Sequence, residues 1–90
     1  MLLSIMNSKQ RKTLDAIFAD PVSKTMPWND IESLLKSVGC RLIEKGGSAV
    51  AFEKDGQMMH AHRPHPQNTV KQYVVVAVRK FLSKIGAEPR

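Results

Sequence analysis

The sequence predicts an α+β domain in which helices cover one face of a three-stranded antiparallel sheet, in the order α-α-β-β-β-α. Apolar residues recur at helical spacing near both ends of the chain, whereas between positions 40 and 62 they alternate as in half-buried strands. Within that middle region, Asp55-Gly56 is a strong signal for a two-residue hairpin turn. A chain of 90 residues has the size of one domain, so we expect a single domain over residues 1–90.

The first predicted helix covers residues 8–20 and follows a leader, residues 1–7, that we expect to be disordered. Ser8 is a suitable N-cap, and Asp20-Pro21 ends the helix because the residue before a proline disfavours helical backbone. The residues at core-facing positions are Leu14, Ile17 and Phe18.

A second helix is predicted from Trp28 to Val38, where Gly39 ends it. Trp28 lies one turn before the apolar stripe of this helix and is expected to pack in the core. The stripe consists of Ile31, Leu34, Leu35 and Val38. We expect residues 28–87 to form the body of the domain, with residues 8–20 as an extra N-terminal helix.

Three strands follow, over residues 40–45, 48–54 and 57–62, and Gly46-Gly47 and Asp55-Gly56 supply their turns. Because successive side chains of a strand point to opposite faces, the middle strand divides into two sets. Val50 and Phe52 share one face, and Ala49, Ala51 and Glu53 share the other.

The last helix is predicted to begin at a cap on Asn68 or Thr69 and to continue to Lys84. Its expected apolar stripe consists of Val70, Tyr73, Val74, Ala77, Val78, Phe81, Leu82 and Ile85. Val75 and Val76 lie off this stripe, so either they meet a partner protein or a second copy, or they are buried under the first helix.

The composition is basic, because 14 Lys and Arg against 8 Asp and Glu give a formal net charge of +6. Such a charge attracts nucleic acid, an acidic protein or an anionic membrane, and it does not distinguish among these three kinds of partner. The apolar runs are shorter than the roughly 18 residues that cross a bilayer, so we expect no membrane partner. The single cysteine, Cys40, excludes an internal disulfide and favours a reduced, cytoplasmic setting.

All three histidines, His60, His62 and His65, lie within six residues. We expect Met59 and Ala61 to face the helices and His60 and His62 to face outward, because burying unpartnered imidazoles is unfavourable. Histidine has an unperturbed pKa of about 6.5, so it can remove a proton from a ribose 2′-hydroxyl or protonate a leaving 5′-oxygen.

Cations near the histidines favour metal-free RNA cleavage as their function. Arg63 lies between His62 and His65, and Lys45 and Lys54 lie at strand ends, where a cation can stabilise charge on phosphorus. A metal site is the alternative, but further ligands are missing, so we expect no metal and no other cofactor beyond adventitious nickel or zinc. The histidines are otherwise simply solvated surface residues.

Several motifs also occur in an order that is typical of one protein family. They are a helix ending in glycine, a strand, Gly47-Ser48, an Asp-Gly turn, and His62-Arg63-Pro64-His65-Pro66 before the last helix. This pattern, from Trp28 to Ala87, resembles the HicA family of bacterial type II toxins, and the segment before Pro21 resembles the extra helix of one branch.

The resemblance implies a double-stranded-RNA-binding-domain-like fold. It further implies a metal-independent endoribonuclease that cleaves messenger RNA and arrests translation. The implied partner is a HicB antitoxin, which covers the active surface in a toxin–antitoxin complex.

The chain departs from the family at Ala49, since most members carry the catalytic histidine at this position, directly after Gly-Ser. Three explanations remain open. This branch uses a neighbouring histidine, with His62 across the sheet as first choice and His60 as second; or the chain is an inactivated variant; or it is a naturally weak member. Cross-strand Cβ atoms lie roughly 4.5–5.5 Å apart, so an imidazole on the next strand can take the role of a histidine at position 49.

The resemblance assigns His65 to a phosphate-orienting or turn-bracing role. Arg63 is the better phosphate-binding residue, because guanidinium binds phosphate through two parallel hydrogen bonds. The other expected RNA-binding residues are Lys45, Lys54, Ser48, Lys71 and Arg79, and the cations placed on the exposed part of the last helix are Lys71, Arg79, Lys80 and Lys84.

Two other functions remain open: a non-catalytic RNA-binding module, and a subunit that binds only its antitoxin. The first is weakened by the expected placement of the aromatic residues, Tyr73 included, on core stripes, since single-strand binders rely on exposed rings.

Overall fold

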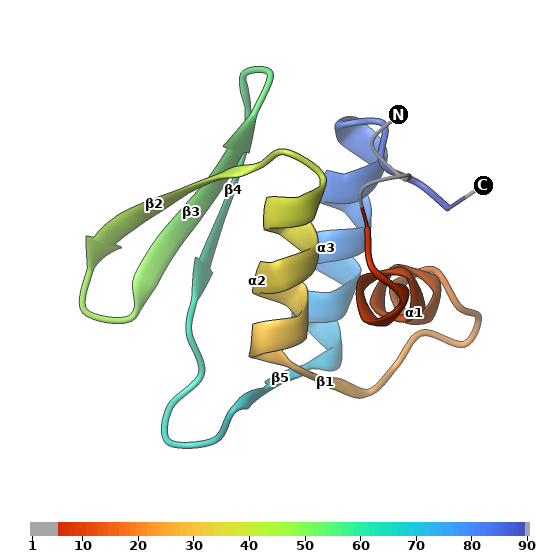
Figure 1. The fold of residues 1–90 in the computed structure, drawn as a ribbon. Coiled ribbons are helices and arrows are strands. Elements are labelled where there is room, and N and C mark those ends of the chain that lie inside the picture. Colours follow the sequence, from red (N-terminus) through yellow and green to blue (C-terminus); the bar gives the residue numbers. More distant parts are fainter. Residues whose placement is uncertain (1–5, 90) are drawn as a thin grey trace.

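The computed structural model describes residues 6–89 and confirms the predicted α+β class and its order of helices and long strands (Figure 1). The helices are α1 (Ser8–Ile17), α2 (Trp28–Ser37) and α3 (Gln72–Lys84). The strands are β1 (Thr25–Pro27), β2 (Arg41–Gly46), β3 (Ala49–Lys54), β4 (Gln57–His62) and β5 (Thr69–Lys71). Within residues 6–89 no helix is both long enough and apolar enough to span a membrane.

Strands β2, β3 and β4 form an antiparallel sheet in chain order, and α2 and α3 cover one of its faces (Figure 1). Val50 and Phe52 of β3 point to the helices and are fully or almost fully buried, as the alternation predicts. Phe52 pairs across the sheet with Met59, and its ring centroid lies 6.0 Å from that of Trp28 on α2. These contacts join the sheet to the helical layer.

Helix α1 packs on α2 and α3, on the side away from the sheet (Figure 1). Its N-cap is Asn7, one residue before the predicted cap. The Asn7 side chain accepts a hydrogen bond from the Gln10 backbone N–H at 2.8 Å, and Gln10 Oε1 accepts one from the Asn7 N–H at 2.9 Å. Met6 is buried in the core, so this part of the expected leader belongs to the domain, and positions 1–5 lie outside the described residues.

The sequence pattern misses a short ribbon formed by β1 and β5. These strands pair antiparallel, with Met26 opposite Val70, and both side chains are buried. Residues expected to begin the last helix are therefore extended, and α3 starts later, after an N-cap at Lys71. The prediction failed because the partner of β5 is distant in sequence, so local periodicity carries no sign of it.

The apolar stripe of α3 also differs from the predicted one. The buried residues of the helix are Val75, Val78, Phe81 and Leu82. Tyr73, predicted to be core, is 73% exposed. Because successive helical residues are about 100° apart, positions 73 and 75 lie on nearly opposite sides. One of the two alternatives for Val75, burial, is thus confirmed. Because Val75 is buried, Tyr73 points outward.

Arg79 connects α3 to the end of α1 instead of lying on the exposed part of α3 as predicted. Its Nε donates to the Ile17 carbonyl at 2.8 Å, its second terminal nitrogen donates to the Ala19 carbonyl, and its Cζ lies 5.6 Å from the centroid of the Phe18 ring. Ile17 supplies one of the unsatisfied carbonyls of the α1 C-terminus, where a cation is favourable, and Ala19 follows the C-cap Phe18.

We therefore expect Arg79→Ala to lower the free energy of unfolding by about 1–3 kcal/mol, since it removes two charge-assisted hydrogen bonds. Urea denaturation measures the change. Lys80→Ala is the matched control, because Lys80 is the exposed neighbour on the same helix. Equal stability of the two variants would contradict a structural role for Arg79.

Candidate active site

The last residue of β4, His62, lies on the open face of the sheet beside two small residues. His62 pairs with Ala49, and Ala49 pairs in turn with Gly46. His60 and His62 are exposed while Met59 is 9% exposed, which confirms the predicted orientation of β4. Alanine and glycine have little or no side chain, so these two neighbours place little bulk beside the His62 imidazole.

Ser48, directly before β3, is a hydrogen-bonding partner of His62. Ser48 Oγ lies 3.3 Å from Nδ1 of His62. The backbone N–H of Arg63 donates to the Ser48 carbonyl at 2.9 Å, which continues the β3–β4 pairing by one residue and keeps the two segments in place. A partner at Nδ1 orients the ring and leaves Nε2 for a ligand.

The segment between β4 and α3 borders an open groove of about 340 Å³. His62, Arg63, His65 and Lys71 are among its lining residues, and no Asp or Glu of residues 6–89 is. A groove with cationic and imidazole side chains but no carboxylate attracts anions. A larger hollow, of about 560 Å³, lies over α2 and contains none of the predicted site residues.

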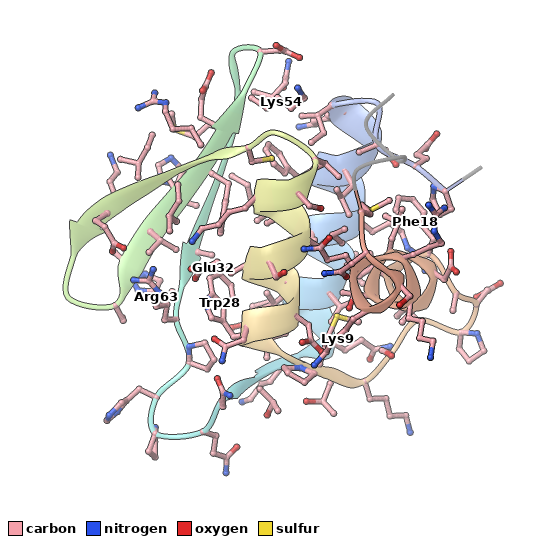
Figure 2. The ribbon with its side chains drawn as sticks, viewed as in Figure 1. Lys9, Phe18, Trp28, Glu32, Lys54 and Arg63 are labelled. Atoms are coloured by element: carbon pink, nitrogen blue, oxygen red, sulfur yellow. The ribbon has the colours of Figure 1, made fainter. Side chains whose placement is uncertain are left out.

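Arg63, the predicted phosphate ligand, is held by two carboxylates, and Figure 2 labels Arg63 and one of the two, Glu32. Its terminal nitrogens donate to the two carboxylate oxygens of Glu44 at 2.8 and 2.9 Å, and its Nε lies 3.4 Å from Oε1 of Glu32. Glu32 also accepts from Trp28 Nε1 at 2.9 Å and pairs with Lys36 at 3.1 Å. We call these five residues the Arg63 network; it joins α2, β2 and the end of β4.

The remaining predicted cations do not all gather at His62. Lys45 occupies a bulge of β2, between the pairs that Glu44 and Gly46 make with β3, and Lys71 lines the groove. Among residues 6–89 neither lysine forms a salt bridge. Lys54 ends β3 at the opposite end from Ala49, about 17 Å away at about 3.3 Å per residue, and Figure 2 shows it far from Arg63. Arg79 donates its hydrogen bonds to carbonyls at the end of α1, as described above.

Comparison with known proteins places the chain in a family. The model of the family described as "HicA toxin of bacterial toxin-antitoxin" matches residues 28–87. The chain belongs to this HicA toxin family. No match was found among curated proteins or among solved structures. The matched range runs from the first residue of α2 to the segment after α3, and the α+β architecture is consistent with the double-stranded-RNA-binding-domain-like fold that the resemblance implies.

The sequence interpretation missed two residues of this candidate site. Tyr73 was assigned to the core, although it lines the groove beside Lys71. Glu44 was not singled out, although it binds Arg63. A signal for Glu44 did exist: it alternates with Leu42 on the helix-facing side of β2, and the alternation of β4 places Arg63 on that same side.

Ionisation in the site follows from these contacts. The hydrogen bond from Arg63 lowers the pKa of Glu44 below its usual value. Burial alone would raise the pKa of Glu32, but hydrogen bonds with Lys36 and Trp28, together with the positive charges of Lys36 and Arg63, outweigh it, so that this pKa is lowered too. In return, the hydrogen bond to Glu44 raises the pKa of Arg63.

A carboxylate with a lowered pKa contributes stability above its unfolded-state pKa and loses it as the pH falls through the folded-state value. We therefore expect Glu44→Gln to lower the melting temperature at pH 7, and the difference from the wild type to shrink as the pH falls from about 5 to about 3. Thermal melts across this range check it. Asp15→Asn, at an exposed carboxylate that forms none of the salt bridges of residues 6–89, is the control. A difference that grows on acidification would contradict the assigned ion pair.

Nucleophilic or metal chemistry has less support among the described side chains. Within residues 6–89, no three His, Cys, Asp or Glu side chains come together as a metal-binding group. Burial raises the pKa of the Cys40 thiol to about 11, so the thiol stays protonated and a poor nucleophile near neutral pH.

For this reason we expect Cys40 to react with iodoacetamide at pH 8 at least tenfold more slowly in the native protein than in urea. Mass spectrometry of the alkylated chain follows the reaction. Equal rates in the two states would show that the thiol is accessible.

Proposed function

We propose that this HicA-family chain is a metal-independent endoribonuclease that cleaves messenger RNA and so arrests translation. The observation that carries the proposal is the position of His62. It is exposed, hydrogen-bonded to Ser48, and paired with Ala49, the position at which the family resemblance expects the catalytic histidine. The imidazole that is missing from β3 thus has a counterpart directly across the sheet.

In the proposed reaction, His62 takes the proton of a ribose 2′-hydroxyl, and the 2′-oxygen attacks phosphorus. The P–O5′ bond breaks as a 2′,3′-cyclic phosphate forms, and the leaving 5′-oxygen receives a proton from an imidazolium. We assign this acid to His65, because it lines the same groove as His62. His60, on the same face of β4, is the second choice for the base.

Lys71 and Lys45 are the proposed phosphate-binding cations. Their ammonium groups are not engaged in salt bridges of the described chain, whereas the guanidinium of Arg63 is neutralised by Glu44 and Glu32. We assign Arg63 a positioning role, because its backbone N–H holds Ser48 and its side chain holds β2 against α2.

Membership of a toxin–antitoxin family supports an antitoxin protein as partner. We propose a HicB-type antitoxin that covers the histidine-bearing face in a hetero-oligomer, and a cytoplasmic location where messenger RNA is available. The net charge of +6 favours an acidic contact surface on that partner.

The alanine at position 49, where the resemblance expects the catalytic histidine, also supports a second candidate function. In this alternative the chain is an inactive toxin that binds RNA or its antitoxin without cleaving RNA. Such a protein would retain RNA affinity that decreases with salt, but it would generate no new RNA ends. Cleavage by the purified chain separates the two functions.

We expect the purified protein to cut single-stranded RNA in EDTA and to leave 2′,3′-cyclic phosphate and 5′-hydroxyl ends. His62→Ala should reduce the rate by about 10²-fold or more, because it removes the general base. His65→Ala should also slow cleavage. End mapping by sequencing and a gel-based rate assay provide the measurements.

Lys54→Ala is the matched control, since it removes a cation at the far end of β3 and should leave cleavage unchanged. Circular dichroism melts test whether each variant is folded. If His60→Ala, His62→Ala and His65→Ala all retain the full rate, the proton-transfer mechanism is wrong.

A further inference from the structure

Tyr73 is an exposed aromatic residue beside the histidines. It is 73% exposed, and Met58 is the other large apolar residue of the described chain that is exposed, at 47%. Tyr73 lies in the first turn of α3, and the burial of Val75 on the opposite side of the helix keeps it out of the core. Its ring borders the same groove as His62 and Lys71.

The groove combines the two features that a nucleotide requires. An aromatic ring offers a stacking surface for a base of any sequence, and cationic side chains attract the phosphate. The groove provides the ring of Tyr73 and the ammonium of Lys71, and no Asp or Glu side chain of the described chain lines it. Its volume of about 340 Å³ lies within the range of about 300–1,000 Å³ that is usual for small-molecule sites.

We infer that Tyr73 is the base-stacking residue of this site, and that the groove takes a nucleotide of single-stranded RNA with its base on the phenol ring and its phosphate toward Lys71. A single strand is required because the bases of a duplex are stacked on one another and offer no free face. The inference rests on the proposed function and specifies its substrate class: unpaired RNA in preference to duplex.

If Tyr73 acts by stacking, RNA binding requires its ring and does not require its hydroxyl. Tyr73→Phe keeps the stacking surface, whereas Tyr73→Ala removes it. Neither change alters the charge of the groove, so the number of phosphate contacts, and with it the salt dependence of binding, should stay the same.

The test measures binding of a fluorescent single-stranded RNA whose 2′-hydroxyls are methylated, so that it cannot be cleaved by attack of the 2′-oxygen. We expect Tyr73→Ala to weaken binding about tenfold and Tyr73→Phe to change it less than twofold. Met58→Ala, at the other exposed apolar residue, should have no effect. An oligonucleotide of the same length without bases should bind the wild type and Tyr73→Ala equally.

A second readout uses the fact that Tyr73 is the only tyrosine of the chain. In protein labelled with ¹³C at tyrosine, one set of ring resonances is observed. Addition of the base-bearing RNA should shift it upfield through the ring current of the stacked base, whereas the abasic strand should not.

The inference is overturned if Tyr73→Ala binds RNA as tightly as the wild type, or if Tyr73→Phe loses as much affinity as Tyr73→Ala. It is also overturned if the change weakens only antitoxin binding, because Tyr73 would then serve a protein contact. In these cases RNA cleavage by the wild type persists, so the proposed function stands. Absence of any RNA binding by the wild type would refute both.

Discussion

The pairing of β3 with β4 decides what every side chain of the site can do. Side chains alternate between faces, so the register that sets Phe52 opposite Met59 in the core also sets Ala49 opposite His62 on the open face. A slip of β4 by one residue would turn its histidines toward the core and Met59 toward the open face. Because the buried face contacts Trp28 and the rest of the core, packing beneath the sheet fixes the chemistry above it.

The segment after β4 also has a defined position, because a backbone hydrogen bond holds it at each end. At its start, the Arg63 N–H donates to the Ser48 carbonyl; at its end, the Trp28 N–H donates to the Asn68 carbonyl at 2.9 Å, next to the β1–β5 ribbon. His65 therefore lies on a short connection between two fixed points, as is common for functional loops on a rigid scaffold. The ribbon is small, yet it determines where the groove begins and where α3 starts.

Local sequence pattern predicted the three helices, the three-stranded sheet, its turns and the outward orientation of His60 and His62, because each depends on nearby residues. It did not predict features that depend on distant partners. The β1–β5 ribbon was missed for that reason, and the later start of α3 changed the assignment of Tyr73. The RNA-binding cations were predicted from residue type alone. Residue type could not show that Arg63 is paired with Glu44 or that Arg79 donates to the Ile17 carbonyl. The roles of the histidines remain predictions that cleavage assays must decide.

The Arg63 network has one practical consequence, which follows from the position of the single tryptophan. The indole N–H of Trp28 donates to Oε1 of Glu32, and the same oxygen is the one that lies 3.4 Å from the Nε of Arg63. Any anion that draws the guanidinium away from its carboxylates must change the charge felt by a buried fluorophore, whose emission depends on nearby charges and hydrogen bonds. Unlabelled protein therefore carries its own optical probe, which in a stopped-flow mixing experiment reports an anion that reaches the Arg63 guanidinium at the groove.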